Sequence, residues 1–232
     1  MIEEPPLLSI KRPSRRPTNT QIAAFQNVPT SFVVDALYGG GALAAVIRPI
    51  GDGRDIDCRA AGPALTVDNG PGDILAVLAA LGSIQQGDVV IAACDGYQGC
   101  AAAGDRVIGM CKNNGAIGYV TDGPVRDYTG IVAVNLPVWC TGLTPASPFA
   151  KGPGRVGHPV QIGGQHVATG DMVVADRDGV VIVPFDRIDE VVAMLERVTE
   201  MEILLDAEVA EGRKMPDSIS ELLISDQVSF VD

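Results

Sequence analysis

The stretch Asp88-Val-Val-Ile-Ala-Ala-Cys94 is an apolar run with no polar residue between its two ends, and together with the segments that follow it indicates the fold class. A continuous apolar run of this length is typical of a strand that is buried on both faces of its sheet. Residues 102–114 then show a helical pattern that closes at Asn-Asn-Gly, and residues 116–120 form the next apolar strand. Because strand and helix alternate here, we predict a parallel arrangement and an α/β fold.

The N-terminal part extends the same alternation. Residues 64–67 predict a short strand, and residues 74–82 predict an apolar helix that ends at a glycine. Residues 18–25 and 30–37 each predict a short helix, the second one ending at a run of three glycines. Residues 1–17 are rich in Pro, Arg and Ser, so we predict an extended arm there. Its basic cluster fits either a solvated tail or an arm that docks onto a neighbouring subunit.

The C-terminal part changes to a turn-rich β layer. Four short predicted strands alternate with glycine-containing turns, at residues 159–162, 165–167, 171–175 and 179–184. Asp186 is the expected cap of a long helix that runs to about Ala210, and residues 136–140 and 219–224 predict a short strand and a short helix. Since no interior linker or strong internal repeat is visible, we predict one domain of β, β and α layers over residues 18–232.

The composition bounds the function classes. The chain has 232 residues and a formal net charge of −12, which argues against a nucleic-acid partner because phosphate binding needs clustered Lys and Arg. Its five cysteines are odd in number and none forms a C-x-x-C pair, so they predict plain buried thiols rather than disulfides or a zinc site. No apolar run reaches membrane length and no signal-peptide pattern precedes the arm, so we expect a cytoplasmic protein without a membrane partner.

Several common catalytic motifs are absent from the sequence. No glycine-rich turn fits a P-loop or a dinucleotide-binding G-x-G-x-x-G that opens a helix. No nucleophile elbow or Ser-His-Asp order appears, and His158 and His166 stand in the turn-rich β segment beside Gly and Gln. Nucleotide binding and serine-hydrolase chemistry are therefore poorly supported.

Acidic residues follow two neighbouring predicted strands. Gly104-Asp105 lies near the start of the 102–114 helix, and Arg126-Asp127 follows the 116–120 strand. The loops after adjacent parallel strands meet at one edge of the sheet, so we expect these residues to converge. Two carboxylates with few nitrogen ligands suit Mg²⁺, which keeps several of its waters, and Arg126 could bind a substrate carboxylate. From the residues alone, a structural turn pair of Arg126 and Asp127 remains a strong alternative interpretation.

The same residues carry a resemblance to a known family. Gly104-Asp105, followed by Asp122-Gly-Pro-Val-Arg-Asp127, resembles the signature of the class II 4-hydroxy-4-methyl-2-oxoglutarate aldolases, a family shared with the regulator of RNase E activity. Further blocks resemble the family in the family's order: Asp35-Ala-Leu37, Gly62-Pro-Ala-Leu-Thr66, Pro71-Gly-Asp73, Gln86-Gly-Asp88, Gly152-Pro-Gly154 and residues 169–184. The resemblance covers roughly residues 30–212.

The resemblance implies a swivelling β/β/α domain that assembles as a homotrimer or homohexamer with sites at subunit interfaces. It implies that Asp127 holds Mg²⁺, Mn²⁺ or another divalent cation, and that Asp105 supports the metal through water. Arg126 would bind the keto acid and stabilise its enolate, and backbone amides around Gly104, Asp105 and Arg106 would bind the pyruvyl carboxylate. Glu202 matches a family glutamate that reaches a neighbour's site, although by its position it is also an ordinary solvated helix residue.

The implied reaction is metal-dependent cleavage of a C–C bond in a 2-keto acid, either by retro-aldol cleavage or by decarboxylation of oxaloacetate. Both leave a pyruvate enolate whose charge the metal and Arg126 stabilise. No Schiff-base lysine is needed. Two departures leave the substrate open: Ile74 stands where the family commonly has Asn, and Arg106 where it commonly has Leu.

Two alternatives stay beside the lyase hypothesis. One is a non-catalytic interaction protein that resembles the regulator of RNase E activity and needs no metal. The other is an enzyme of another class on the same scaffold, including the methyltransferase activity once attached to this family, although no glycine-rich nucleoside loop supports it. Dependence of any lyase activity on a divalent cation would separate the first alternative from the lyase.

Overall fold

A computed structural model of the chain describes residues 6–231. The main sheet contains β1 (Leu8–Ile10), β2 (Arg48–Pro49), β3 (Ala60–Asp68), β4 (Val89–Ala93), β5 (Gly118–Thr121), β6 (Val138–Cys140) and β7 (Gly154–Val156). The remaining strands are β8 (Val160–Ile162), β9 (Gln165–Val167), β10 (Met172–Ala175) and β11 (Val180–Val183). The helices are α1 (Asn19–Ala24), α2 (Thr30–Ala36), α3 (Leu75–Ala80), α4 (Asp105–Asn113), α5 (Tyr128–Val134), α6 (Ile188–Ala210) and α7 (Asp217–Leu223), with 3-10 turns η1 (Ile50–Gly53) and η2 (Phe185–Arg187).

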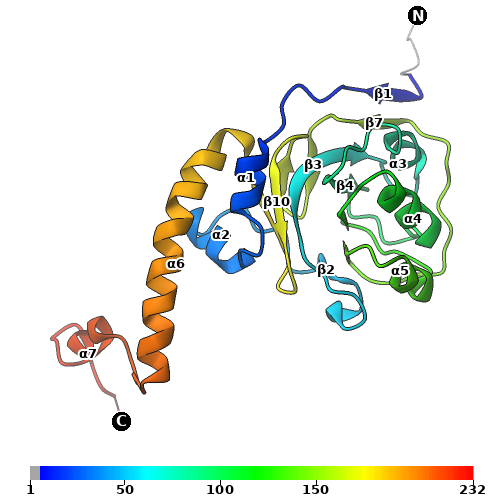
Figure 1. Cartoon of the computed structure of the whole chain (residues 1–232). Coiled ribbons are helices and arrows are strands. Elements are labelled where there is room, and N and C mark those ends of the chain that lie inside the picture. Colours follow the sequence, from blue (N-terminus) through cyan, green and yellow to red (C-terminus); the bar gives the residue numbers. More distant parts are fainter. Residues whose placement is uncertain (1–5, 232) are drawn as a thin grey trace, which may run out of the picture.

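The main sheet is built around β4. The strand order is β1-β7-β3-β4-β5-β6-β2, and β4 runs parallel to β3 and β5, with Ile91 opposite Thr66 on one side and Val120 on the other. All five residues of β4 are buried, which confirms the prediction of a strand covered on both faces. Helices α3, α4 and α5 lie together on one side of this sheet (Figure 1).

A second β layer packs against the other face, and β3 joins the two layers. Residues 60–63 of β3 pair antiparallel with β10, which in turn pairs with β11, whereas residues 64–68 pair parallel with β4. Eight of the nine residues of β3 are buried, because the strand lies inside both layers. Helices, main sheet and second β layer make the three-layer α/β fold that the sequence predicted.

A second apolar core lies on the outer side of β10 and β11. Phe25 of the turn after α1, Val33 of α2 and Val191 of α6 pack there against Met172 and Val183. Helices α1, α2 and α6 thereby cover the second β layer (Figure 1). The prediction of N-terminal and C-terminal helices around the domain is confirmed in this arrangement.

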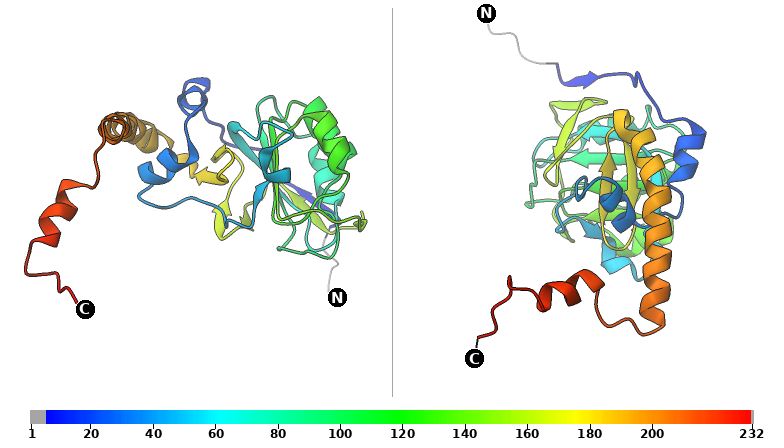
Figure 2. Two further views of the ribbon diagram at one scale, coloured as in Figure 1. Left: turned by 90° about the horizontal axis from the view of Figure 1, so that it is seen from below. Right: turned by 90° about the vertical axis from the view of Figure 1, so that its left-hand side faces the viewer.

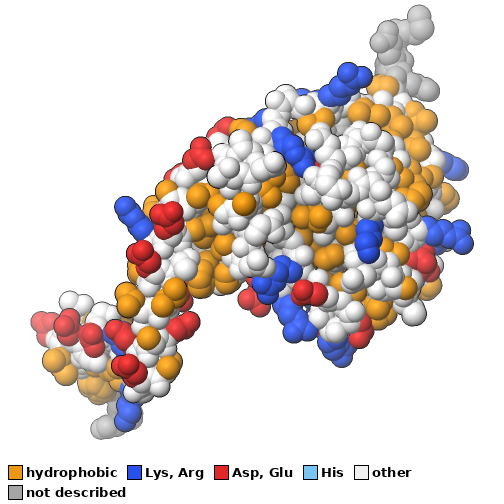
Figure 3. Space-filling view, in the orientation of Figure 1, with side chains coloured by type: hydrophobic (Ala, Val, Ile, Leu, Met, Phe, Trp, Pro, Cys, Tyr) orange, Lys and Arg blue, Asp and Glu red, His pale blue; other side chains and the backbone are white. Residues whose placement is uncertain are grey.

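The far half of α6 leaves the body of the molecule. Leu195 is buried, but Met201 and Leu204 are 69% and 66% exposed. Figure 2 shows this half of α6 and the following α7 projecting beyond the rest of the chain, and Figure 3 shows apolar and acidic side chains mixed along it. This segment takes little part in the core of its own chain.

The N-terminal arm is bound to its own chain. β1 pairs parallel with β7, Arg15 contacts Asp171 at 3.1 Å, and Arg16 is bonded to the carboxylate of Asp88. Both aspartates are 3% exposed, so each buried charge has a guanidinium partner. The described part of the arm is therefore held against its own chain rather than free in solvent, and its docking onto a neighbouring subunit stays a prediction; residues 1–5 lie outside the described range.

Several elements differ from the prediction. The helix expected from residue 102 begins at Asp105, because Gly104 before it has an extended backbone. The short strands β1, β2 and β7 and the helix α5 were not expected. Across residues 6–231, no helix is both long and apolar enough to cross a membrane.

Candidate active site

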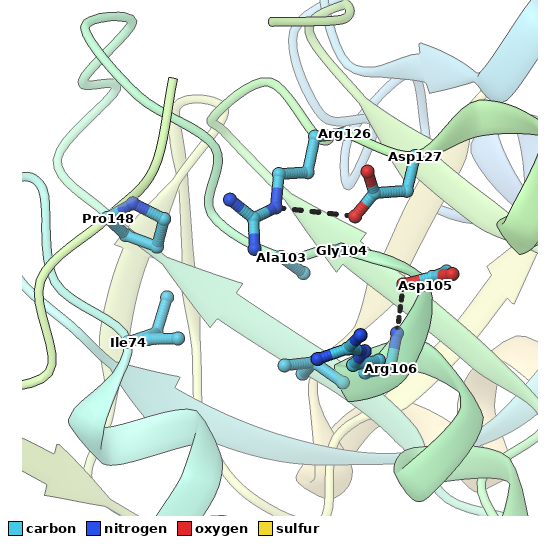
Figure 4. Close-up of a pocket in the computed structure, with 9 residues that line it drawn as sticks. Ile74, Ala103, Gly104, Asp105, Arg106, Arg126, Asp127 and Pro148 are labelled. Carbon is cyan, nitrogen blue, oxygen red and sulfur yellow. Dashed lines mark hydrogen bonds and ion pairs between the residues drawn. The ribbon is translucent and has the colours of Figure 1, made fainter. Parts of the chain in front are cut away.

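A cavity of about 300 Å³ opens at the carboxyl ends of β4 and β5. Loops that leave two parallel strands meet at this edge, as expected for a ligand site in an α/β sheet. The lining comprises Ile74, Ala103, Gly104, Asp105, Arg106, Val107, Arg126, Asp127 and Pro148 (Figure 4). The structure thus brings together five of the six residues that the sequence analysis singled out.

A buried aspartate fixes the two loops beside each other. Asp122, the first residue after β5, is 9% exposed and accepts hydrogen bonds from the backbone N–H groups of Cys94 (2.7 Å) and Gly96 (2.8 Å). The side chain of Gln98 also donates to the carbonyl oxygen of Asp122 at 2.9 Å. The sequence analysis gave Asp122 no role; its place directly after a buried strand was the available signal.

Asp105 is the first residue of α4. Gly104 caps the helix with an extended backbone (φ −132°, ψ 179°) and has no side chain to occupy the helix start. Asp105 Oδ1 accepts the N–H of Arg106 at 2.7 Å, so the carboxylate itself uses one of the amides that were expected to bind the substrate. A Cβ on Gly130 would lie 2.3 Å from Asp105 Oδ2, which shows that the carboxylate rests directly on glycine backbone.

Arg126 and Asp127 are held against the start of α4 by main-chain pairing. The N–H of Arg126 donates to the carbonyl oxygen of Ala103 at 3.0 Å, and Val125 forms parallel bridges to Ala103 and Leu143. This pairing explains why the two segments converge as predicted. The segment after β6, reached through Leu143, also contributes to the site.

The two side chains contact each other. Arg126 Nε lies 3.3 Å from Asp127 Oδ2, and Arg126 Nη1 donates to Ser147 Oγ at 2.6 Å (Figure 4). The two side chains are 37% and 47% exposed, so the pair is open to solvent and to a ligand. The ion pair is present as the turn interpretation expects, and it also forms one wall of the cavity, as the site interpretation expects.

Asp127 has a left-handed backbone. Its φ is 62° and its ψ is 47°, a conformation that Asp tolerates better than most residues. It stands at the N-cap of α5, yet its side chain makes no capping hydrogen bond. Oδ2 instead lies against Gly104, where a Cβ would be 2.7 Å away. An uncommon backbone that turns a carboxylate away from its helix and into a cavity is typical of a functional position.

The donor set fits a hard divalent cation that keeps its waters. Among the described residues no group of three or more His, Cys, Asp or Glu side chains gathers, so a closed zinc-type site is not formed there. Asp105 and Asp127 both line the cavity, and two carboxylates are the usual protein share of a Mg²⁺ site. Gly104 and Gly130 have no side chains, so the carboxylates of Asp127 and Asp105 fit directly against their backbones.

The sixth predicted residue lies elsewhere. Glu202 is on the projecting half of α6 and is not part of this lining. In Figure 1 that half lies on the opposite side of the molecule from α4. Within one chain Glu202 does not join the site, and its expected role at a neighbour's site stays a prediction.

A second hollow adjoins the same ion pair. Arg126, Asp127, Tyr128, Leu143, Thr144 and Pro145 line it. The hydroxyl of Tyr128 is hydrogen-bonded to Asp55, and this bond raises the pKa of the Tyr128 phenol. Sequence reasoning missed Tyr128, Ser147 and Pro148, because none belongs to a recognisable motif.

A comparison with known protein families shows which family this chain belongs to. The sequence model described as "RraA-like: Aldolase/RraA" matches residues 30–182, more than half of the chain. The chain belongs to the Aldolase/RraA family. The resemblance inferred from the sequence is thereby confirmed, and the family match includes every lining residue of the 300 Å³ cavity.

Similar proteins and solved structures agree with this assignment. A protein of Halalkalibacterium halodurans named "Putative 4-hydroxy-4-methyl-2-oxoglutarate aldolase" is 38% identical over 163 residues, which cover 70% of this chain and 76% of that protein. Streptomyces coelicolor RraAS2, described as "an unusual member of the RNase ES inhibitor RraA protein family", is 27% identical with a TM-score of 0.73 over 83% of this chain and 100% of its own. A protein from Pseudomonas syringae pv. tomato, 24% identical with a TM-score of 0.74 over 89% and 95% of the two chains, shares the fold.

Proposed function

We propose that the chain is a divalent-metal-dependent lyase that cleaves a C–C bond of a 2-keto acid and releases pyruvate. The reaction would be of the 4-hydroxy-4-methyl-2-oxoglutarate aldolase type, the oxaloacetate decarboxylase type, or both. The observation that carries the proposal is the arrangement of Arg126 and Asp127 around Gly104-Asp105 in one cavity. The name of the Halalkalibacterium halodurans relative supports the same chemistry.

Arg126 is the residue we assign to charge stabilisation. Its guanidinium lines the cavity and is oriented by two contacts, with Asp127 Oδ2 at 3.3 Å and with Ser147 Oγ at 2.6 Å. Cleavage moves the electron pair of the broken C–C bond into the C2–C3 enolate of pyruvate, and the enolate then takes a proton at C3. A fixed guanidinium beside the developing negative oxygen stabilises that transition state without having to reorganise.

Asp105 and Asp127 are the residues we assign to the metal. When bound there, Mg²⁺, Mn²⁺ or another divalent cation would supply Lewis-acid polarisation of the 2-keto group. The carboxylate of Asp127 caps no helix and contacts Arg126 through Oδ2, and Asp105 lies at the helix start, where among the described residues its carboxylate accepts the N–H of Arg106. These residues place a carboxylate on each of the two loops that meet at the cavity.

The active assembly is proposed to be a homotrimer or homohexamer. The exposed apolar residues Met201 and Leu204 on the projecting half of α6 leave a surface that its own chain does not cover. Glu202 lies on the same projecting half of α6, and we propose that assembly brings it to the site of a neighbouring copy. The molar mass in solution tests the assembly, and an unchanged rate for Glu202→Gln would remove Glu202 from the site.

The deciding experiment measures pyruvate. The purified protein is incubated with oxaloacetate and, separately, with 4-hydroxy-4-methyl-2-oxoglutarate, each with Mg²⁺ and with EDTA. Mg²⁺-dependent release of pyruvate from either substrate is the expected result. No release from either substrate, by a folded protein, would contradict the proposal.

A second candidate function is a non-catalytic interaction protein. It is favoured by the similarity to Streptomyces coelicolor RraAS2, which is described as a member of an RNase ES inhibitor family. Such a protein binds its partner without a metal, so EDTA would leave the binding intact. Loss of pyruvate release in EDTA with no change in partner binding would show both properties in one chain.

A further inference from the structure

Arg106 is a second arginine of the same cavity, and its side chain has no ion-pair partner in the part of the chain that the structure describes. It is the second residue of α4 and lines the cavity together with Arg126. Among residues 6–231 no carboxylate lies within 4.0 Å of its guanidinium, and the hydrogen bond it makes through its backbone N–H does not involve the side chain. By contrast, the guanidinium of Arg126 already contacts Asp127 and Ser147.

The charges of the lining point to a ligand with two negative groups. Arg106 and Arg126 balance Asp105 and Asp127, so the lining as a whole is neutral. A divalent cation on the two carboxylates would leave two positive charges in excess. A keto acid with one carboxylate neutralises half of that excess, whereas a dicarboxylic keto acid neutralises all of it.

The apolar part of the lining fits the middle of such a ligand. Ile74 and Pro148 line the same cavity as the two arginines and offer no hydrogen-bond donor. Methylene and methyl groups of a ligand pack favourably against such side chains. Figure 4 shows Ile74 and Pro148 together on one side of the cavity, with Arg126 above and Arg106 below, so the carbon chain of a ligand held by both arginines would pass these apolar side chains.

We propose that the Arg106 side chain binds the second, distal carboxylate of the substrate and so selects dicarboxylic 2-keto acids over monocarboxylic ones. This inference rests on the proposed function, because it takes the keto acid end to lie at Arg126 and the metal. A guanidinium suits this task, since its planar donors match the two oxygens of a carboxylate.

The test uses two ligands that differ only at the distal end. 2-Oxoglutarate and 2-oxopentanoate have the same five-carbon chain, and one ends in a carboxylate where the other ends in a methyl group. Their affinities are measured by calorimetry in the presence of Mg²⁺ for the wild type, Arg106→Leu and Arg106→Lys. Arg197→Leu is the matched control, because Arg197 is an exposed arginine on α6 with no ion-pair partner in the described chain.

We expect the wild type and the Arg197→Leu variant to bind 2-oxoglutarate about tenfold more tightly than 2-oxopentanoate, as for one charge-assisted contact. Arg106→Leu should lose this preference without a change in 2-oxopentanoate affinity, and Arg106→Lys should keep part of it. Equal binding of the two ligands by the wild type, or a preference that survives in Arg106→Leu, would overturn the inference about Arg106 but would leave the proposed function standing. Failure of both ligands to bind the wild type with Mg²⁺ would instead count against the proposed function itself.

Discussion

A side-chain carbon on Gly104 would lie 2.7 Å from Oδ2 of Asp127 and 3.1 Å from Nε of Arg126. The closest real contacts of a Cβ atom are longer than the first of these distances, so the space beside the glycine is reserved for the aspartate. Gly130 makes room for the carboxylate of Asp105 in the same way. The two carboxylates of the cavity are thus positioned by the absence of side chains on the neighbouring helix and turn.

Gly104→Ala should displace the carboxylate of Asp127 and lower the affinity for Mg²⁺ and the kcat/KM for pyruvate release by about tenfold or more. The backbone of Gly104 is extended, so alanine fits its dihedral angles and the free energy of unfolding should change by less than about 1 kcal/mol. Steady-state kinetics and urea unfolding measure the two effects. Gly109→Ala is the control on the same helix, because a Cβ there would lie 3.5 Å from its nearest neighbouring atom, an ordinary contact distance. Equal activity of the two variants would contradict the claim that Gly104 makes room for the Asp127 carboxylate.

Asp127→Asn should abolish metal-dependent pyruvate release, because the amide keeps the shape and tolerates the φ of 62° but lacks the charge that binds the cation. Asp127→Ala should do the same, with about 1 kcal/mol of additional backbone cost at this dihedral angle. Pyruvate assays, with the molar mass by light scattering as the control for assembly, measure the result. Full activity of the asparagine variant would remove Asp127 from the site.

Arg126→Ala should lower kcat/KM by about 3 kcal/mol, the usual loss when one charge-stabilising contact of a transition state is removed. Arg126→Lys should fall between the alanine variant and the wild type, because it keeps the charge but loses the contact pair with Asp127 and Ser147. Kinetics and thermal unfolding are compared. If only the stability changed, Arg126 and Asp127 would be a structural turn pair.

The cysteines should make stability fall at alkaline pH. Burial raises the pKa of Cys94 and Cys111 to about 12 and that of Cys140 to about 11, and the nearby Asp122 adds to the effect at Cys94. Unfolded thiols ionise near the ordinary value of 9.0, so the folded state holds more protons above that pH. The stabilisation is complete below about pH 9 and is lost as pH rises toward 11 or 12.

Urea unfolding from pH 7.5 to 10.5 measures this loss, and Cys111→Ala should show a shallower fall than the wild type. At pH 8 the native thiols should react slowly with a disulfide reagent, and urea should expose all five. Rapid reaction of Cys94 in the native protein would contradict the burial argument.

Arg16→Ala should destabilise the fold by about 2 kcal/mol at pH 7, because among the described residues it leaves the buried carboxylate of Asp88 with only the N–H of Gln85 as a partner. Burial already raises the pKa of Asp88, so acid that neutralises this carboxylate should reduce the cost. Urea unfolding at two pH values measures it. Arg12→Ala is the control, since Arg12 is exposed and has no ion-pair partner among the described residues; an equal loss there would contradict the role of Arg16.

Part of the fold could be predicted because its signal is local. The apolar run of β4 and the capped helix α1 were found from neighbouring residues alone. Helix α5 was missed because it is seven residues long and contains Gly130 and four β-branched residues, so its helical propensity is low. Its buried Ile131 packs against the main core, and that contact stabilises what the local sequence does not.

The sequence by itself determined the parallel α/β layout, because the alternation of strand and helix and the burial of the strands follow from local apolar patterns. It also predicted the convergence of Asp105, Arg126 and Asp127, because loops after adjacent parallel strands meet at one edge of the sheet. Only the tertiary structure decided the rest of the site. Pro148 enters the cavity through a segment paired at Leu143, and the arm is fixed by Arg16 on Asp88, 72 residues away. Such contacts depend on which distant surfaces meet, and no periodicity along the chain encodes them.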